Sequence, residues 1–155
     1  MSASTLSLLL ERAEAERDAA AQALHAANAQ AQAARAQHGE LSGYRQEYQQ
    51  RWTEQFARAT AMDIVACYQS FGQRLNQAVD TQGHVAQHAD QREERARDAL
   101  RQAEMRVAAL RQLIKRREAE AKAAADRREQ RIPPPLGVDG GAIGMRGAAD
   151  AHRRP

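Results

Sequence analysis

Leucine and alanine recur along the first 41 residues with steps that alternate between four and three. Eleven positions follow this spacing, and nine of them are Leu or Ala. They are positions 6, 10, 13, 17, 20, 24, 27, 31, 34, 38 and 41. Residues spaced in this way lie along one stripe of an α-helix, which is the stripe that a coiled coil buries. The pattern therefore predicts a long helix over residues 5–58.

A second series of the same kind follows in the other half of the chain. It runs through positions 64, 68, 71, 75, 78, 82, 85, 89, 92 and 96, takes an additional step of four to 100, and continues to 124. This series predicts a second helix over residues 61–131, with a stutter that locally relaxes the supercoil. A single helix cannot bury its own stripe, so we expect the two helices to pack on each other or on a partner.

The spacing also predicts where the chain turns. Two sets of four residues share a 4-3-4 spacing, and when they are paired in reverse order the residue numbers of every pair add up to 119. The sets are Gln37, Leu41, Tyr44 and Tyr48, and Phe71, Leu75, Ala78 and Gln82. Thr60, followed three residues later by Asp63, has the form of a helix N-cap. We therefore predict an all-α fold, an antiparallel coiled-coil hairpin over residues 1–132 with its turn at about 59–61.

The composition agrees with long helices and differs from that of a conventional globular domain. Ala, Glu, Lys, Leu and Arg make up about 52% of the 155 residues, and Ile, Leu, Val and Phe only about 14%. The four prolines are at 133, 134, 135 and 155, so none interrupts residues 1–132. From 133 onward the chain is rich in glycine and poor in bulky residues, which predicts a disordered tail over 133–155.

Several classes of protein are not expected from this sequence. The leucines at 8–10 have no basic residue before them and charged residues directly after them, which does not fit a signal peptide or a membrane span. A single cysteine, Cys67, argues against disulfides and fits a reducing compartment. No catalytic or nucleotide-binding motif is found, so we expect no enzyme and no cofactor. The sequence points to a cytoplasmic protein.

Three histidines form the only candidate metal site. His84 and His88 are four residues apart and share one helical face, and the pairing described above brings His38 level with them. This spacing can hold Zn²⁺. The alternative is that these are solvated surface histidines, and we expect no bound metal.

Basic residues are concentrated at the end of the second helix. Residues 92–131 carry 13 basic and 8 acidic side chains, and residues 1–91 carry 7 and 10. The predicted pairing leaves about 15 residues of the second helix, from 116 to 131, beyond the start of the first, so the free end of the hairpin should be cationic. The candidate contacts are Arg106, Arg111, Lys115, Arg116 and Arg117. They could form a solvated face, bind an acidic protein or contact nucleic acid, but no aromatic residue follows Phe71 to support nucleic-acid binding.

The large aromatic residues lie close to the predicted turn. All six, Tyr44, Tyr48, Trp52, Phe56, Tyr68 and Phe71, fall between positions 44 and 71. They could fill the core where the helices diverge, or they could anchor a binding partner. The sequence leaves both interpretations open.

Two central segments, YRQEYQQR at 44–51 and YQSFGQRLNQA at 68–78, carry a resemblance to a known family. Together with LLL at 8–10, AEAE at 13–16 and RREQ at 127–130, they make the chain similar to the flagellar export protein FliJ over residues 1 to about 131. Gly72 stands where that family usually has an apolar residue. The resemblance implies a non-enzymatic, cytoplasmic adaptor of the flagellar type III protein export apparatus.

The resemblance also implies partners and sites. The open end of the coiled coil would bind the hexameric export ATPase, and the five basic residues named above are our candidates for that contact. Another region would bind the cytoplasmic domain of the export-gate membrane protein, which gives peripheral association with the inner membrane, and the protein would also handle export chaperones. The gate-binding patch maps onto Gln37, Leu41, Tyr44, Tyr48, Phe71, Leu75, Ala78 and Gln82. Two alternatives remain: the stalk protein of a virulence-type secretion system, and a basic coiled coil that binds nucleic acid.

Overall fold

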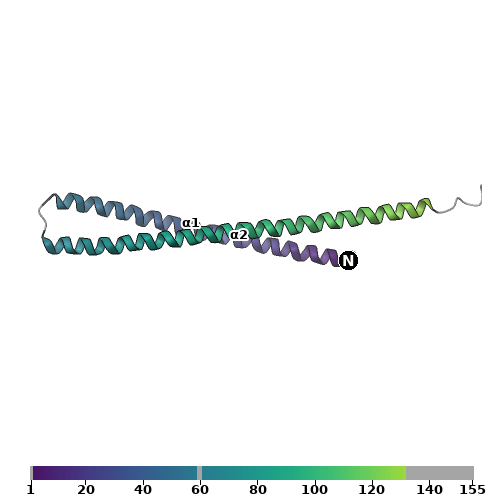
Figure 1. Ribbon diagram of the computed structural model, residues 1–155, viewed down its shortest axis with the longest axis horizontal. Coiled ribbons are helices and arrows are strands. Elements are labelled where there is room, and N and C mark those ends of the chain that lie inside the picture. The colour runs from purple at the N-terminus through teal and green to yellow at the C-terminus, as the bar shows by residue number, and fades with distance from the viewer. Residues whose placement is uncertain (1, 59–60, 132–155) are drawn as a thin grey trace, which may run out of the picture. The chain divides into compact units, whose positions relative to one another are not determined.

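The computed structural model describes residues 2–58 and 61–131, and this part of the chain contains two long helices and no strand. Helix α1 spans Ala3–Phe56 and helix α2 spans Met62–Gln130, against expected bounds of 5–58 and 61–131. The chain forms two units, residues 1–112 and 113–155, and α2 contributes to both. In the first unit the two helices run antiparallel, side by side (Figure 1), which confirms the predicted all-α hairpin. The predicted cap at Thr60 and the predicted tail at 133–155 lie outside the described residues, so the division into hairpin and tail stays a prediction.

Local interactions explain where the helices begin. Before α1, the Ser2 side chain accepts a hydrogen bond from the Thr5 backbone N–H at 3.2 Å, which satisfies one of the donors that a helix start leaves free. At the start of α2, the carbonyl of Ala61 accepts from the backbone N–H groups of Ile64 and Val65 at 3.1 and 3.3 Å. No proline or positive φ interrupts either helix.

The stripe predicted for α1 faces α2. All eleven predicted positions are buried or half-buried, from Leu6, which is 2% exposed, to Leu41. Most residues between them are exposed. The 4-3 spacing therefore predicted the inward face of α1 correctly, because on this helix Leu and Ala occupy the stripe almost without interruption.

The stripe predicted for α2 is wrong at every second position in its first half. Ile64, Phe71, Ala78, Val85 and Arg92 are exposed, and the residue after each of them faces α1 instead. In the first unit the inward face of α2 is Val65, Tyr68, Gly72, Leu75, Val79, Gln82, Ala86, Ala89, Glu93, Ala96, Leu100, Ala103, Val107 and Leu110. Together with the stripe of α1, which continues from Leu41 through Arg45, Tyr48 and Trp52, we call this the seam. These positions alternate steps of three and four throughout, so the predicted stutter between 92 and 100 does not exist.

The size of the facing residues explains this difference at Val85 and Ala86. Ala31 and Ala34 of α1 pack in one cluster with Ala86 and Ala89 of α2, and Ala31 is 0% exposed. Small side chains let two helices approach closely, so a bulky residue such as Val85 is better placed at the edge of the seam than within it. Counting back in regular steps from Leu100 would have located the seam.

The antiparallel pairing predicted from the residue numbers is present. The side chains of Gln37 and Gln82, one of the predicted pairs, form a hydrogen bond of 3.2 Å. The rings of Tyr48 and Phe71, another predicted pair, have centroids 4.8 Å apart. The first and the last of the four predicted residue pairs are thus in contact, so the two helices have the predicted register.

A charged residue interrupts the alanine seam. Glu93 is 8% exposed and is the only buried charged residue in the described part of the chain. Its Oε1 accepts from Arg97 at 2.7 Å and from Asn28 at 3.3 Å. Its Oε2 has no hydrogen bond and lies 4.0 Å from an Arg35 nitrogen, and Arg35 itself pairs with Asp90. Burying a carboxylate costs free energy that such incomplete pairing only partly offsets.

We therefore expect replacement of Glu93 by Leu to preserve or increase stability. An apolar side chain of similar size removes the desolvation cost of the carboxylate, and comparable replacements of buried ion pairs change stability by about 1–4 kcal/mol in the stabilising direction or not at all. Urea unfolding followed by circular dichroism would measure the change. The matched control is Glu94→Leu, an exposed neighbour that should shift stability by less than about 0.5 kcal/mol. A clear loss of stability in Glu93→Leu alone would show that the carboxylate network stabilises the hairpin.

Candidate functional site

Six aromatic side chains cluster where α1 ends and α2 begins, and Tyr48 is at their centre. Its ring contacts four others, with centroid distances of 4.8 Å to Phe71, 5.1 Å to Tyr68, 6.2 Å to Trp52 and 6.5 Å to Tyr44. Offset and edge-to-face ring pairs at these distances stabilise a fold beyond the area that they bury. The half-buried Tyr48 therefore holds the two helices together at this end of the first unit.

The hydroxyl of Tyr48 also belongs to the interior of the cluster. It donates a long hydrogen bond of 3.5 Å to the carbonyl oxygen of Tyr68. Burial raises the pKa of Tyr48 above its usual value of 10.0, and the neighbouring Tyr68 hydroxyl adds to the increase. The un-ionised phenol is thus the form that the fold favours. Its contribution to stability is fully present below pH 10 and is lost as the pH rises through the elevated pKa.

The eight residues expected to bind the export gate divide into two groups. Four of them belong to the seam and are at least half-buried: Leu41, Tyr48, Leu75 and Gln82. The other four are exposed: Gln37, Tyr44, Phe71 and Ala78. Leu75 is only 7% exposed, which leaves it little surface for a partner, whereas Tyr44 is 47% and Phe71 is 40% exposed. The two exposed rings are the candidate anchors.

The exposed group lies on one side of the hairpin. Tyr44 comes one residue before a seam residue of α1, and Phe71 one residue before a seam residue of α2. In an antiparallel pair an approximate two-fold axis relates the helices, and it places such positions on the same side of the seam. The ion pair between Glu16 and Arg106, at 3.4 Å, joins two positions of this same type farther along the hairpin.

We call this side the lateral face and define it by the exposed residues that precede the seam near the aromatic cluster. They are Gln37 and Tyr44 on α1, and Ile64, Phe71, Ala78 and Val85 on α2. Ile64 and Val85, 47% and 44% exposed, extend the row of apolar side chains beyond the expected patch in both directions. Their heptad spacing from Phe71 was visible in the sequence, but it had placed them in the core.

The opposite side of the hairpin has a different character. An open hollow of about 390 Å³ lies beside Gly72, where a Cβ atom would meet nothing within 4 Å. Its lining combines the rings of Tyr48 and Tyr68 with several polar side chains. These include Arg45, Gln49, Gln69, Gln73 and Asn76. Gly72 is thus a gap in the seam, and the apolar stripe is confined to the lateral face.

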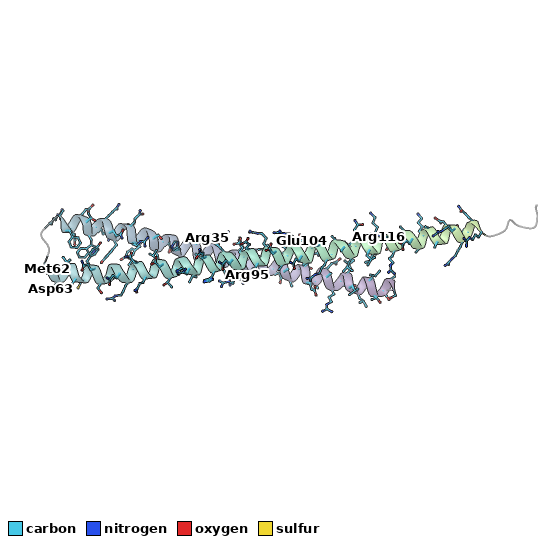
Figure 2. The ribbon with its side chains drawn as sticks, in the orientation of Figure 1. Arg35, Met62, Asp63, Arg95, Glu104 and Arg116 are labelled. Atoms are coloured by element: carbon cyan, nitrogen blue, oxygen red, sulfur yellow. The ribbon has the colours of Figure 1, made fainter. Side chains whose placement is uncertain are left out.

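The five basic residues expected to bind the ATPase differ in their surroundings. Arg106 pairs with Glu16 at 3.4 Å, and Arg111 pairs with Glu14 at 3.3 Å, so α1 neutralises two of the five. Lys115 and Arg116, like Arg117, are exposed on the part of α2 that belongs to the second unit (Figure 2 labels Arg116). The uncharged residues next to Arg106 and Arg111 in the sequence gave no sign of their acidic partners on the other helix.

The histidines do not come together in a metal-binding arrangement. His84 and His88 are exposed, and the described residues contain no group of three His, Cys, Asp or Glu side chains placed to hold a metal ion. The nitrogen Nε2 of His38 instead lies 3.2 Å from the place where a Cβ of Gly83 would be, so the absence of a side chain at Gly83 makes room for the imidazole.

The sequence was also compared with known proteins. Within the described residues, neither helix has an apolar stretch of the length that crossing a membrane requires. No curated protein and no solved structure matches the chain. A family model described as "Flagellar FliJ protein" matches residues 1–132, which include both helices. The chain therefore belongs to the flagellar FliJ protein family and has a role related to flagellar protein export.

Proposed function

We propose that the protein is a non-catalytic adaptor that links the hexameric flagellar export ATPase to the export gate. The observation that carries this proposal is the pair of exposed rings, Tyr44 and Phe71, which lie on the same side of the hairpin. Exposed aromatic residues gathered on one face are typical anchors of a protein partner. The family resemblance assigns this region to the cytoplasmic domain of the gate.

A second, chemically different surface supports a second partner. Phe71 and Arg106 are 35 residues apart on α2, which is about 50 Å at a rise of 1.5 Å per residue. The basic stretch that begins at Arg106 is therefore too far from the aromatic rings to share one small binding site with them. Since Arg106 and Arg111 already pair with glutamates, we propose Lys115 and Arg116 as the main electrostatic contacts to the ATPase.

The resemblance also supports the remaining parts of the proposal. The protein would act in the cytoplasm, associate with the inner membrane through the gate, and assist delivery by export chaperones. Each of these steps requires only reversible protein contacts, which an elongated pair of helices can offer along its exposed faces. None of them requires an enclosed catalytic cavity.

A recruitment assay tests the adaptor role. The cytoplasmic domain of the gate is immobilised, and retention of the export ATPase is measured with and without the protein. We expect retention only when the protein is present. Replacing Lys115 and Arg116 by Glu should slow association with the ATPase about tenfold or more, because charge complementarity acts mainly on the rate of encounter, while the protein itself stays on the gate.

The matched control for this charge reversal is Arg95→Glu with Arg101→Glu, two exposed arginines of α2 outside the basic stretch. This control should recruit the ATPase normally. Failure of the unmodified protein to retain the ATPase on the gate would contradict the adaptor role. Equal losses in both double variants would instead show that only overall charge matters.

A further inference from the structure

The lateral face has a row of apolar side chains with the seven-residue spacing of a coiled-coil heptad. Ile64, Phe71, Ala78 and Val85 are seven residues apart, so their side chains recur every 10 Å or so along α2. The three large ones are 40–47% exposed. Apolar side chains of a second helix recur with the same period when they follow a heptad pattern, so such a helix can place one apolar side chain against each repeat.

The edge of the lateral face on α1 is acidic. Glu40 and Glu47 each come three residues after a lateral-face residue of the same helix, and Glu54 comes three residues after Arg51, so the three line this edge. All three are exposed. Arg51 is also exposed on this side, which leaves the edge with a net charge of about minus two between residues 37 and 54.

The edge on α2 is different. Arg74, three residues after Phe71, is the charged residue there, and its guanidinium donates to the Ser70 hydroxyl at 3.2 Å. The apolar row therefore has acidic residues on one side and an arginine on the other. A partner that lies along the row meets its complement if it carries basic residues towards α1.

We propose that the lateral face binds an amphipathic α-helix with a heptad row of apolar residues and a basic edge, which packs along the hairpin as a third helix. This inference rests on the proposed gate contact, because the same face contains Tyr44 and Phe71. It adds two residues, Ile64 and Val85, and it specifies the shape and charge of the bound segment. The partner helix covers the apolar row, and its basic edge lies next to Glu40, Glu47 and Glu54.

Designed peptides test the face without requiring the natural partner. The probe is a 21-residue helical peptide with Leu at the heptad core positions and Lys at the flanking positions, and the comparison peptide has Glu in place of every Lys. We expect the Lys peptide to bind the full-length protein and the Glu peptide to bind at least about tenfold more weakly. Ile64→Gln with Val85→Gln should weaken binding of the Lys peptide at least about tenfold, since both lose apolar contact.

Two further variants separate the charge from the apolar row. Replacing Glu40, Glu47 and Glu54 by Gln should abolish the preference for the Lys peptide. Met105→Gln, which changes a 65% exposed residue outside the lateral face, should leave binding unchanged. All changed residues are exposed, so the helical circular dichroism signal should be preserved. Equal binding of the two peptides, or binding that is insensitive to both Ile64→Gln and Val85→Gln, overturns the proposal.

The cytoplasmic domain of the gate is then tested with the same variants. If the gate domain binds and Ile64→Gln with Val85→Gln weakens it, the natural partner uses the whole row. If the gate domain binds equally well to this double variant, the gate contact stands and the proposed third-helix geometry is wrong. If the gate domain does not bind the unmodified protein but the Lys peptide does, the adaptor proposal fails and the helix-binding face remains.

Discussion

Replacing Tyr44 and Phe71 together by Ala should weaken binding to the cytoplasmic domain of the gate by at least about 30-fold, with little loss of stability. Truncation of a central aromatic anchor typically costs about 2 kcal/mol or more of binding free energy, and 1.4 kcal/mol corresponds to a factor of ten. Tyr48 is the one ring partner of each, at 6.5 and 4.8 Å, and each of the two rings is at least 40% exposed, so we expect the fold to depend little on them. Calorimetric titration and thermal unfolding of the same variant would measure both quantities.

Met105→Ala is the control for this experiment, because it removes an exposed apolar side chain from α2 outside the lateral face. It should change neither binding nor stability. If the double variant instead lost stability and kept its affinity for the gate domain, Tyr44 and Phe71 would be core residues. The gate contact would then have to lie elsewhere.

Tyr48→Ala, unlike the double variant of Tyr44 and Phe71, should cause a large loss of stability. Tyr48 contacts four rings from both helices, and its removal leaves a space at the centre of the cluster. Truncation of a buried aromatic residue costs about 3–5 kcal/mol, so for this half-buried ring we expect about 2–3 kcal/mol. Urea unfolding monitored by circular dichroism would give the value.

Two related variants show which part of Tyr48 matters. Tyr48→Phe keeps the ring and loses the hydroxyl with its long hydrogen bond to the Tyr68 carbonyl, so it should cost less than about 1 kcal/mol. Tyr44→Ala removes a ring with a single ring partner and should also cost little. Equal losses for Tyr44→Ala and Tyr48→Ala would mean that the ring contacts do not hold the helices together.

The region of the candidate binding surface could be located from the sequence, but the sequence did not show which of its residues are exposed and which are buried. The spacing and the family resemblance both identified the same eight residues. Whether each is core or surface depends on which way it faces, and neighbouring helical residues differ by about 100° in direction. Leu75 and Phe71 are both apolar and one turn apart, yet Leu75 is 7% and Phe71 is 40% exposed.

The basic stretch shows a second limit of the sequence. Arg106 and Arg111 have basic or uncharged neighbours along the chain, which indicated unpaired charge. Their acidic partners, Glu16 and Glu14, are 90 and 97 residues away in the sequence and come close only because the helices pair. The pairing of Arg106 and Arg111 could therefore be recognised only once the register between the two helices was known. It leaves Lys115 and Arg116 as the main candidate contacts to the ATPase.

The sequence by itself determined that the chain forms two long helices, which side of α1 faces inward, and which residues lie opposite one another across the hairpin. These properties follow from local spacing and from the absence of proline, and both can be counted along the chain. Only the tertiary structure decided the inward side of α2. There two adjacent stripes compete, one with Ile64, Phe71 and Val85 and one with Val65, Gly72 and Ala86. At Val85 and Ala86, packing against the small Ala31 and Ala34 of α1 favours the smaller residue, since it lets the helices approach closely. The apolar residues of the other stripe are left on the surface as a candidate binding face.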